Sequence, residues 1–224
     1  EKPLIWAKRL VNQYVNARHP VTGLGGYQFT QPMKTAETTD DQDTNSKYGD
    51  RVKRQFKEFG DIALEGNLLN TNQPDCLYYK NVLMQLYLAQ LLADNGKEFK
   101  EATLSGFKAY IKHGYDFETN MMIPMFSDGT DLTDYKFQRN GYNGAAGSCF
   151  KRKMASARFF LSAVRAYIAS GDDEFWRFAN NIAKFNELGD IGDIGDKKPK
   201  LNFETTQSDP VIIFALVDLY NTYE

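Results

Sequence analysis

Two adjacent side chains with different chemistry close the first predicted helix of this 224-residue chain. Arg18 and His19 stand directly before Pro20, which ends a helix because its ring is incompatible with the helical backbone. A guanidinium can hold a carboxylate through paired hydrogen bonds, and a neutral imidazole can bind a metal ion. The same pair could instead only complement the negative end of the helix dipole, worth roughly 0.3–1 kcal/mol. The residue types therefore leave a catalytic and a structural interpretation open.

A glycine-rich turn follows this pair, at Gly23, Gly25 and Gly26. A phosphate-binding loop would need a helix after the glycines and, in a P-loop, a Lys followed by Ser or Thr, and the sequence shows neither. We therefore predict that the glycines provide tight turns and a close approach of backbone segments.

A complete metal centre within this chain is not predicted. The chain has two histidines, His19 and His113, whereas a metal site takes three or four ligands. His113 falls at a predicted helix end, where it suits the helix dipole. The carboxylates show neither HExxH nor EF-hand spacing, and Cys76 and Cys149 are too far apart for a CxxC site.

Candidate contacts for an anionic sugar come from two further segments. Lys136, Arg139 and Tyr142 lie in a glycine-rich loop of alternating cations and aromatics, and Arg51 opens a basic helix start. Arg binds carboxylates and a Tyr ring can stack on a sugar, although a solvated loop and a solvated helix face are the structural alternatives. The loop would also suit single-stranded nucleic acid. The net charge of −2, from 27 basic and 29 acidic residues, does not favour a nucleic-acid partner.

The elements that would position these residues are predicted to be helices. Apolar spacing and capping signals predict a first helix ending before Pro20 and further helices over 48–59, 75–95, 97–113, 150–169, 174–188 and 211–223. Asp75 is expected to cap the helix over 75–95, Asp172 and Asp173 to cap the helix over 174–188, and Ser208-Asp209-Pro210 to start the last helix. Alternating runs typical of strands are short and few. We predict an all-α fold, a single helical domain over residues 1–224, whose hairpins form part of an (α/α) toroid or incomplete barrel. The long loops 20–48 and 116–150 are expected to form a cleft.

No apolar run approaches the length of a membrane span, so no membrane partner is predicted. The chain does not begin with Met, and we expect that a signal peptide or further residues precede it in the gene.

Several motifs together resemble the pectate lyases of polysaccharide lyase family 2. They begin with Ala17-Arg18-His19-Pro20, continued by Thr22-Gly23-Leu24-Gly25-Gly26-Tyr27-Gln28-Phe29. Further matches are Asp50-Arg51 through Gln55-Phe56 and Phe59-Gly60, then Ala63-Leu64-Glu65-Gly66-Asn67, and finally Ser208-Asp209-Pro210.

The resemblance implies an (α/α) toroid with a cleft for homogalacturonan. It implies cleavage of α-1,4-linked polygalacturonate by β-elimination, with an arginine as base and a divalent transition metal, typically manganese, held by two histidines and a glutamate. Arg18 matches the base and His19 one metal ligand. A periplasmic or secreted location is expected.

One departure from the family pattern concerns the remaining ligands, which precede the Arg-His pair. Only 17 residues precede Arg18 here, with no His, and Glu1 is their one carboxylate. Family members are also much longer. We therefore expect a truncated portion, inactive alone, whose partner is the missing N-terminal part and whose other metal ligands lie upstream.

Two other functions remain open from the sequence. A uronyl hydrolase on a similar barrel would use paired carboxylates, for which Asp128, Asp131 and Asp134 are candidates. A helical fragment that binds acidic sugars without cleaving them is the second. A new double bond in the product would distinguish a lyase from both.

Overall fold

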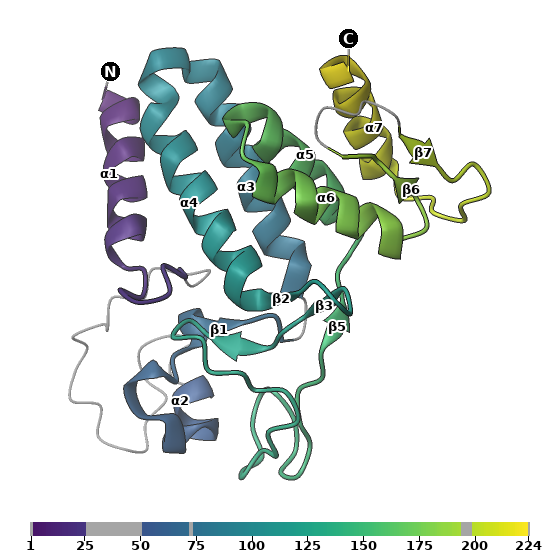
Figure 1. Cartoon of the computed structure of the whole chain (residues 1–224). Coiled ribbons are helices and arrows are strands. Elements are labelled where there is room, and N and C mark those ends of the chain that lie inside the picture. Colours follow the sequence, from purple (N-terminus) through teal and green to yellow (C-terminus); the bar gives the residue numbers. More distant parts are fainter. Residues whose placement is uncertain (1, 26–50, 72–73, 194–198, 224) are drawn as a thin grey trace. The chain divides into compact units, whose positions relative to one another are not determined.

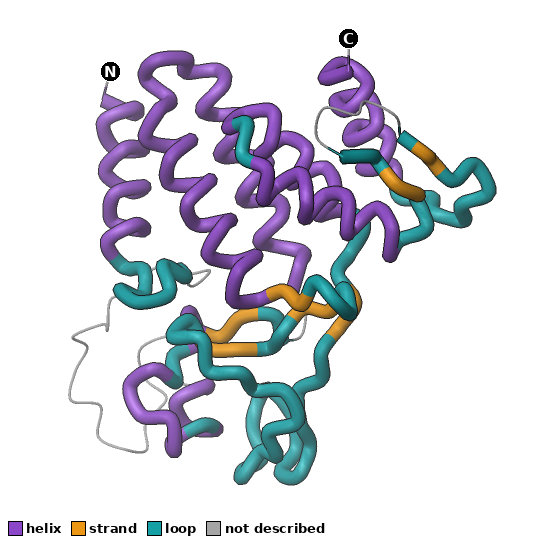
Figure 2. The backbone as a smooth tube through the Cα atoms, in the orientation of Figure 1, coloured by secondary structure: helices purple, strands orange, loops and turns teal. Residues whose placement is uncertain are grey.

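The computed structural model describes residues 2–25, 51–71, 74–193 and 199–223. The chain packs as two compact units, one formed by Glu1–Pro74 with Ile123–Arg152 and the other by Asp75–Met122 with Lys153–Glu224. Helices dominate the described residues and the strands are short (Figures 1 and 2). The mostly α fold predicted from the sequence is therefore confirmed, whereas the toroid and the single domain stay predictions.

The first unit begins with α1 (Lys2–Asn16) and continues through α2 (Arg51–Gln55), η1 (Lys57–Ile62), η2 (Glu65–Asn67) and β1 (Leu68–Leu69). Strand β1 pairs antiparallel with β4 (Met125–Phe126). The helix predicted over 48–59 is α-helical only in α2 within the described residues. The chain then tightens into η1, where Gly60 takes a φ of +63° that favours glycine and interrupts the helical geometry.

An aromatic core holds the first unit together. Phe56 is fully buried, with Phe137 edge-on at 5.3 Å and Phe150 stacked at 6.0 Å between ring centroids. The buried residues of this core are Val52, Phe56, Ala63, Leu68, Phe126, Leu132, Phe137 and Phe150. Burying one such side chain contributes about 1.5–3 kcal/mol. The segment 132–150, which carries no regular element, is thus packed against α2 through Leu132, Phe137 and Phe150.

The second unit contains the long helices. Helices α3 (Pro74–Leu92) and α4 (Lys97–Gly114), joined by η3 (Ala93–Gly96), form the predicted hairpin. Helix α5 (Arg158–Ser170) packs against α6 (Asp173–Phe185) and α7 (Pro210–Tyr223) (Figure 1). Their buried rings meet at Phe107, which stacks on Phe175 at 5.5 Å.

Short strands connect these helices. In the second unit β2 (Tyr115–Asp116) and β5 (Lys153–Met154) flank β3 (Met121–Met122), and β6 (Gly189–Asp190) pairs with β7 (Lys200–Leu201), all antiparallel.

Two predicted helix starts were wrong. Helix α5 begins at Arg158 rather than at Phe150, because Phe150 is part of the aromatic core and residues 153–154 form β5. Helix α3 begins at Pro74, so that Asp75 lies in its first turn instead of capping it.

The predicted cap of α6 is confirmed. Asp172 accepts a hydrogen bond from the Glu174 amide at 3.1 Å through one oxygen, and Lys108 contacts the other oxygen at 2.7 Å. The Lys108 hydrogen bond lowers the pKa of Asp172 below its usual value. The carboxylate therefore joins α6 to α4 as well as capping it.

We predict that Asp172→Ala lowers the free energy of unfolding by about 1 kcal/mol, because the first turn of α6 loses its cap. Asp172→Asn, which keeps an acceptor for the cap, should lose less. Because the folded pKa is depressed, the ionic contribution is present above the unfolded pKa and disappears as pH falls through the folded value. Urea unfolding at neutral and acidic pH measures this, and a wild-type advantage over Asp172→Asn that grows in acid would contradict it.

Candidate active site

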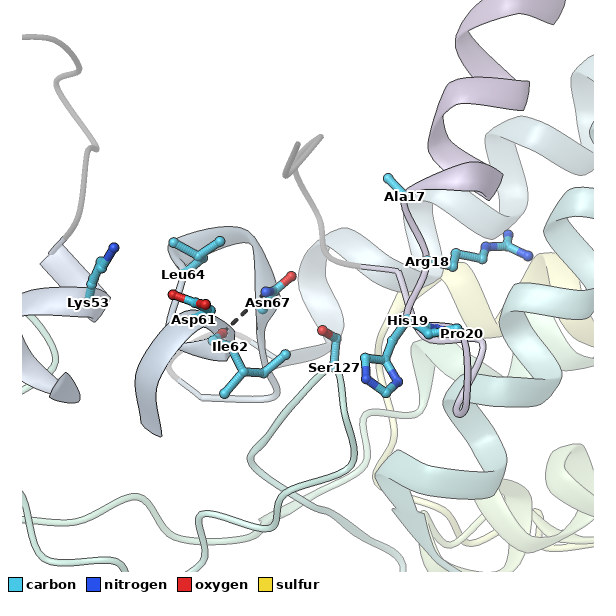
Figure 3. Close-up of a pocket in the computed structure, with 10 residues that line it drawn as sticks. All are labelled: Ala17, Arg18, His19, Pro20, Lys53, Asp61, Ile62, Leu64, Asn67 and Ser127. Carbon is cyan, nitrogen blue, oxygen red and sulfur yellow. Dashed lines mark hydrogen bonds between the residues drawn. The ribbon is translucent and has the colours of Figure 1, made fainter. Parts of the chain in front are cut away.

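A pocket of about 420 Å³ lies where α1 ends in the first unit (Figure 3). Its wall combines the turn after α1, the segments α2 to η2, and the turn after β4. The lining residues are Ala17, Arg18, His19, Pro20, Lys53, Asp61, Ile62, Leu64, Asn67 and Ser127. The predicted pair therefore lies on a concave surface.

Arg18 forms part of this wall, but its side chain lies against Tyr14 of α1. The guanidinium carbon lies 5.3 Å from the centre of the Tyr14 ring, a cation–π distance, and Figure 3 shows the side chain extending away from Asp61 and Asn67. Burial raises the pKa of Tyr14, an effect that the charge of Arg18 partly offsets. The Tyr14 hydroxyl therefore stays protonated at neutral pH.

His19 is held by the turn that it begins. Its amide donates to the Leu24 carbonyl at 2.9 Å, its carbonyl accepts from the Gly23 amide at 2.9 Å, and its Nδ1 accepts from the Thr22 amide at 3.4 Å. Figure 3 shows the imidazole beside Ser127.

Thr22 was not identified as important from the sequence. It is buried, its hydroxyl donates to the Ser127 carbonyl at 2.6 Å, and the same oxygen accepts from the Leu24 amide at 3.1 Å. One buried hydroxyl thus ties the turn of His19 to the loop after β4. A Thr two residues after Pro20 carried no signal of this contact, because its partner is 105 positions away in the sequence.

The glycine prediction is confirmed at two of its three positions. Gly23 has a φ of +72°. Gly25 lies so close to α1 that a Cβ there would come within 2.6 Å of the Tyr14 hydroxyl oxygen. Gly26 and the aromatic pair Tyr27 and Phe29 lie outside the described residues.

A metal ion needs more donors than the described residues bring together. In the parts of the chain that the structure describes, no three His, Cys, Asp or Glu side chains come close enough to hold a metal. The pocket offers His19 and Asp61. His113 lies in the last turn of α4 in the other unit, and burial followed by the charge of Lys112 lowers its pKa. The described residues therefore do not fit a complete metal centre.

Arg51 and Tyr142, both predicted to contact substrate, come together. The Arg51 guanidinium carbon lies 3.8 Å from the centre of the Tyr142 ring. Its NH2 nitrogen also pairs with a Glu65 oxygen at 2.6 Å, and both charged side chains are largely buried. Arg51 therefore already has a carboxylate partner within the protein.

Arg139 and Lys136 also have partners within this loop and its neighbours. Arg139 pairs with Glu58 at 2.5 Å and donates to the Gln55 carbonyl at 3.2 Å. The Lys136 ammonium lies 4.0 Å from the sulfur of Cys149, which is a free, half-buried thiol. Arg139 is thus paired with a carboxylate of the protein, whereas Lys136 is exposed and forms no ion pair with a carboxylate of the described residues.

Gln55 organises this loop, a role that the sequence did not predict. Its side chain is 1% exposed. The amide nitrogen donates to the carbonyls of Arg139 at 3.2 Å and Gly144 at 2.9 Å, while its oxygen accepts from the backbone and side chain of Asn143 at 3.0 and 3.2 Å. At Gly141 a Cβ would lie 2.5 Å from this amide, so that a larger residue there would have to displace the Gln55 side chain. The available signal for this role was the position of the polar Gln55 directly before Phe56, which is buried.

The carboxylates considered for a hydrolase are Asp128, Asp131 and Asp134. Burial would raise the pKa of Asp131, but hydrogen bonds from Thr133 and Arg152 outweigh it and lower the pKa. The hydrogen bond and charge of Lys151 lower the pKa of Asp134. A general acid needs a raised pKa. These two carboxylates therefore suit ion pairs better than acid catalysis.

These observations define a mostly α protein with an Arg–His pair in the wall of a pocket and an aromatic-rich loop packed against α2. The family model described as periplasmic pectate lyase matches residues 1–224. A pectate disaccharide-lyase from Dickeya dadantii (strain 3937) is 39% identical over 171 residues, which cover 75% of this chain and 31% of that protein.

The chain therefore belongs to the periplasmic pectate lyase family, and the resemblance inferred from its motifs is confirmed. It spans about a third of the length of the curated relative. The family's description as periplasmic agrees with the expected periplasmic or secreted location. Of the helices that the structure describes, none has the length and apolar character needed to span a bilayer.

We predict that Gln55→Leu lowers the free energy of unfolding by about 2 kcal/mol, because the carbonyls and amides of the loop 139–144 lose their buried partner. Gln138→Leu is the matched control, since Gln138 is exposed on the same loop and makes one hydrogen bond, to the Lys136 carbonyl at 2.8 Å. Chemical denaturation of both variants measures the difference. Equal losses would show that the Gln55 network adds nothing to stability.

Proposed function

We propose that this chain is the part of a pectate lyase that contributes Arg18 and His19 to the catalytic site. The substrate is α-1,4-linked polygalacturonate and the reaction is β-elimination. One observation carries the proposal: the Arg-His motif of a chain that matches the periplasmic pectate lyase family along its whole length lies in the wall of a pocket. The name of its relative, a pectate disaccharide-lyase, supports the same substrate class.

The proposed reaction removes the proton at C5 of a galacturonosyl residue. That proton is weakly acidic because it lies next to the carboxylate carbon. The C–H electron pair becomes the C4–C5 double bond, the bond from C4 to the glycosidic oxygen breaks, and that oxygen takes up a proton. Negative charge develops on the carboxylate meanwhile, so that positive charge fixed nearby lowers the barrier.

Arg18 is proposed as the base that takes the C5 proton. In the structure its guanidinium lies over Tyr14, so that it has to turn from the ring toward the pocket to reach a bound sugar. A guanidinium is charged at neutral pH and accepts a proton only in its neutral form. The proposal therefore requires activity that increases with alkalinity.

His19 is proposed as one ligand of a divalent transition metal, manganese being the metal that the resemblance implies. The described residues provide too few donors for a complete site, so that the proposal places the remaining ligands outside them. A chelator should then reduce binding of the metal in the full-length protein without unfolding the turn around His19, which backbone hydrogen bonds hold.

A lyase is favoured over a uronyl hydrolase by the ion pairs of the candidate carboxylates. Asp131 pairs with Arg152 at 3.0 Å and Asp134 pairs with Lys151, and the pKa of each carboxylate is lowered. An acid that must donate a proton to a leaving group needs the opposite shift.

In the full-length protein, Arg18→Ala should reduce the formation of ultraviolet-absorbing unsaturated uronide by about 10²–10⁴-fold, the usual contribution of a general base. Arg9→Ala is the matched control, because Arg9, which lies on α1, likewise has its guanidinium 5.2 Å from an aromatic ring, that of Trp6. Product absorbance with polygalacturonate measures both. Retained turnover in Arg18→Ala would remove this residue from the mechanism, and a wild-type product without a double bond would exclude the lyase.

The pH dependence gives an independent test of the base. Wild-type kcat should rise from neutral toward strongly alkaline pH. Arg18→Lys should move this rise to lower pH while reducing the maximum, because a lysine ammonium, with an ordinary pKa of about 10.4, loses its proton more readily than a guanidinium. Initial rates across the pH range measure the profile. The same profile for both enzymes would mean that another group titrates.

A further inference from the structure

An exposed tyrosine stands at the tip of a tightly closed turn in the first unit. Tyr142 is 63% exposed. The turn is closed by two backbone hydrogen bonds, from Gly141 to the Gly144 carbonyl at 3.0 Å and from Gly144 to the Gly141 carbonyl at 3.2 Å. An exposed aromatic ring at such a position is available to a ligand.

The turn is fixed from the inside by the buried Gln55 amide. Asn143, the residue next to Tyr142, donates to the Gln55 oxygen through its backbone and its side chain. The Ala146 amide donates to the Asn140 side chain at 2.9 Å, which closes the loop further along. The backbone that carries Tyr142 is therefore organised before any ligand arrives, which lowers the entropic cost of binding.

The Tyr142 ring itself is fixed by Arg51. The guanidinium covers one face at 3.8 Å from the ring centre, so that the exposed area belongs to the opposite face and the edge. Arg51 is in turn paired with Glu65 at 2.6 Å, and the side chains of this pair are only 22% and 14% exposed. A sugar carboxylate would have to displace Glu65 to bind Arg51.

We propose that the outward face of Tyr142 is a stacking platform for the apolar face of a pyranose ring. The platform recognises the ring and not its carboxylate, because the cation behind the tyrosine is already neutralised. It therefore accepts free and methyl-esterified galacturonosyl residues alike. This inference rests on the proposed function for its substrate class and adds the chemistry by which one sugar residue is held.

Calorimetric titration of the full-length protein, with a chelator present to suppress turnover, tests the platform. Free and methyl-esterified oligogalacturonides of equal length are the ligands. Tyr142→Ala should weaken the binding of both by roughly tenfold, as expected for loss of one aromatic stacking contact. Tyr142→Phe should bind like the wild type because stacking needs the ring and not the hydroxyl. Tyr87→Ala removes a tyrosine of α3 that is 53% exposed and should have no effect.

Salt dependence separates stacking from charge recognition. The ratio of wild-type to Tyr142→Ala affinity should be the same at low and high ionic strength, because screening weakens exposed charge contacts and not stacking. If Tyr142→Ala binds both ligands as tightly as the wild type, the platform is overturned. Failure of the wild type to bind either ligand overturns it as well. A loss confined to the free acid overturns the claim that the carboxylate is ignored.

The platform and the proposed function can fail separately. Absence of unsaturated product from the wild type excludes the lyase but leaves the binding comparison intact. Unchanged binding in Tyr142→Ala, with normal product formation, excludes the platform alone.

Discussion

The buried side-chain amide of Gln55 is the contact on which the first unit's loop depends. It lies at the edge of an aromatic core and satisfies two carbonyls and two N–H donors of residues more than 80 positions away. These groups are partly buried, so that water replaces some of the lost hydrogen bonds and removal of the amide costs about 2 kcal/mol. The rings of Phe56, Phe137 and Phe150 provide the driving force for collapse, but rings alone do not fix the path of a backbone. The amide fixes it, and with it the positions of Arg139 and Tyr142.

At the pocket where α1 ends, a buried polar side chain likewise joins segments that are distant in the sequence. The turn of His19 is closed by its own backbone and joined to the loop after β4 by the hydroxyl of Thr22. The Arg-His pair at this turn lies in the wall of the pocket. The pocket and the aromatic loop therefore carry different chemical groups. The pocket has a guanidinium and an imidazole in its wall. The loop has an exposed tyrosine ring, and the arginine behind that ring is paired with a glutamate.

Local signals in the sequence were sufficient for much of the helical structure. Pro20 marked the end of α1, Asp172 marked the cap of α6, and Pro210 marked the start of α7. The errors arose where distant packing decides. The apolar spacing that begins at Phe150 continues into α5 and predicted a helix from that residue. The Phe150 ring instead packs in the aromatic core, and the helix starts at Arg158.

The sequence was sufficient to predict the residue types of the candidate site, but not the residues with which they pair. Arg51 and Arg139 were visible as cations, whereas the carboxylates that pair with them, Glu65 and Glu58, carried no sequence mark of that role. Gly25 shows what this means for interpreting variants. A single methyl group there would strike the Tyr14 hydroxyl, and the Tyr14 ring supports Arg18. A substitution at Gly25 would therefore have to displace the Tyr14 ring, and would alter the surroundings of Arg18 without touching it.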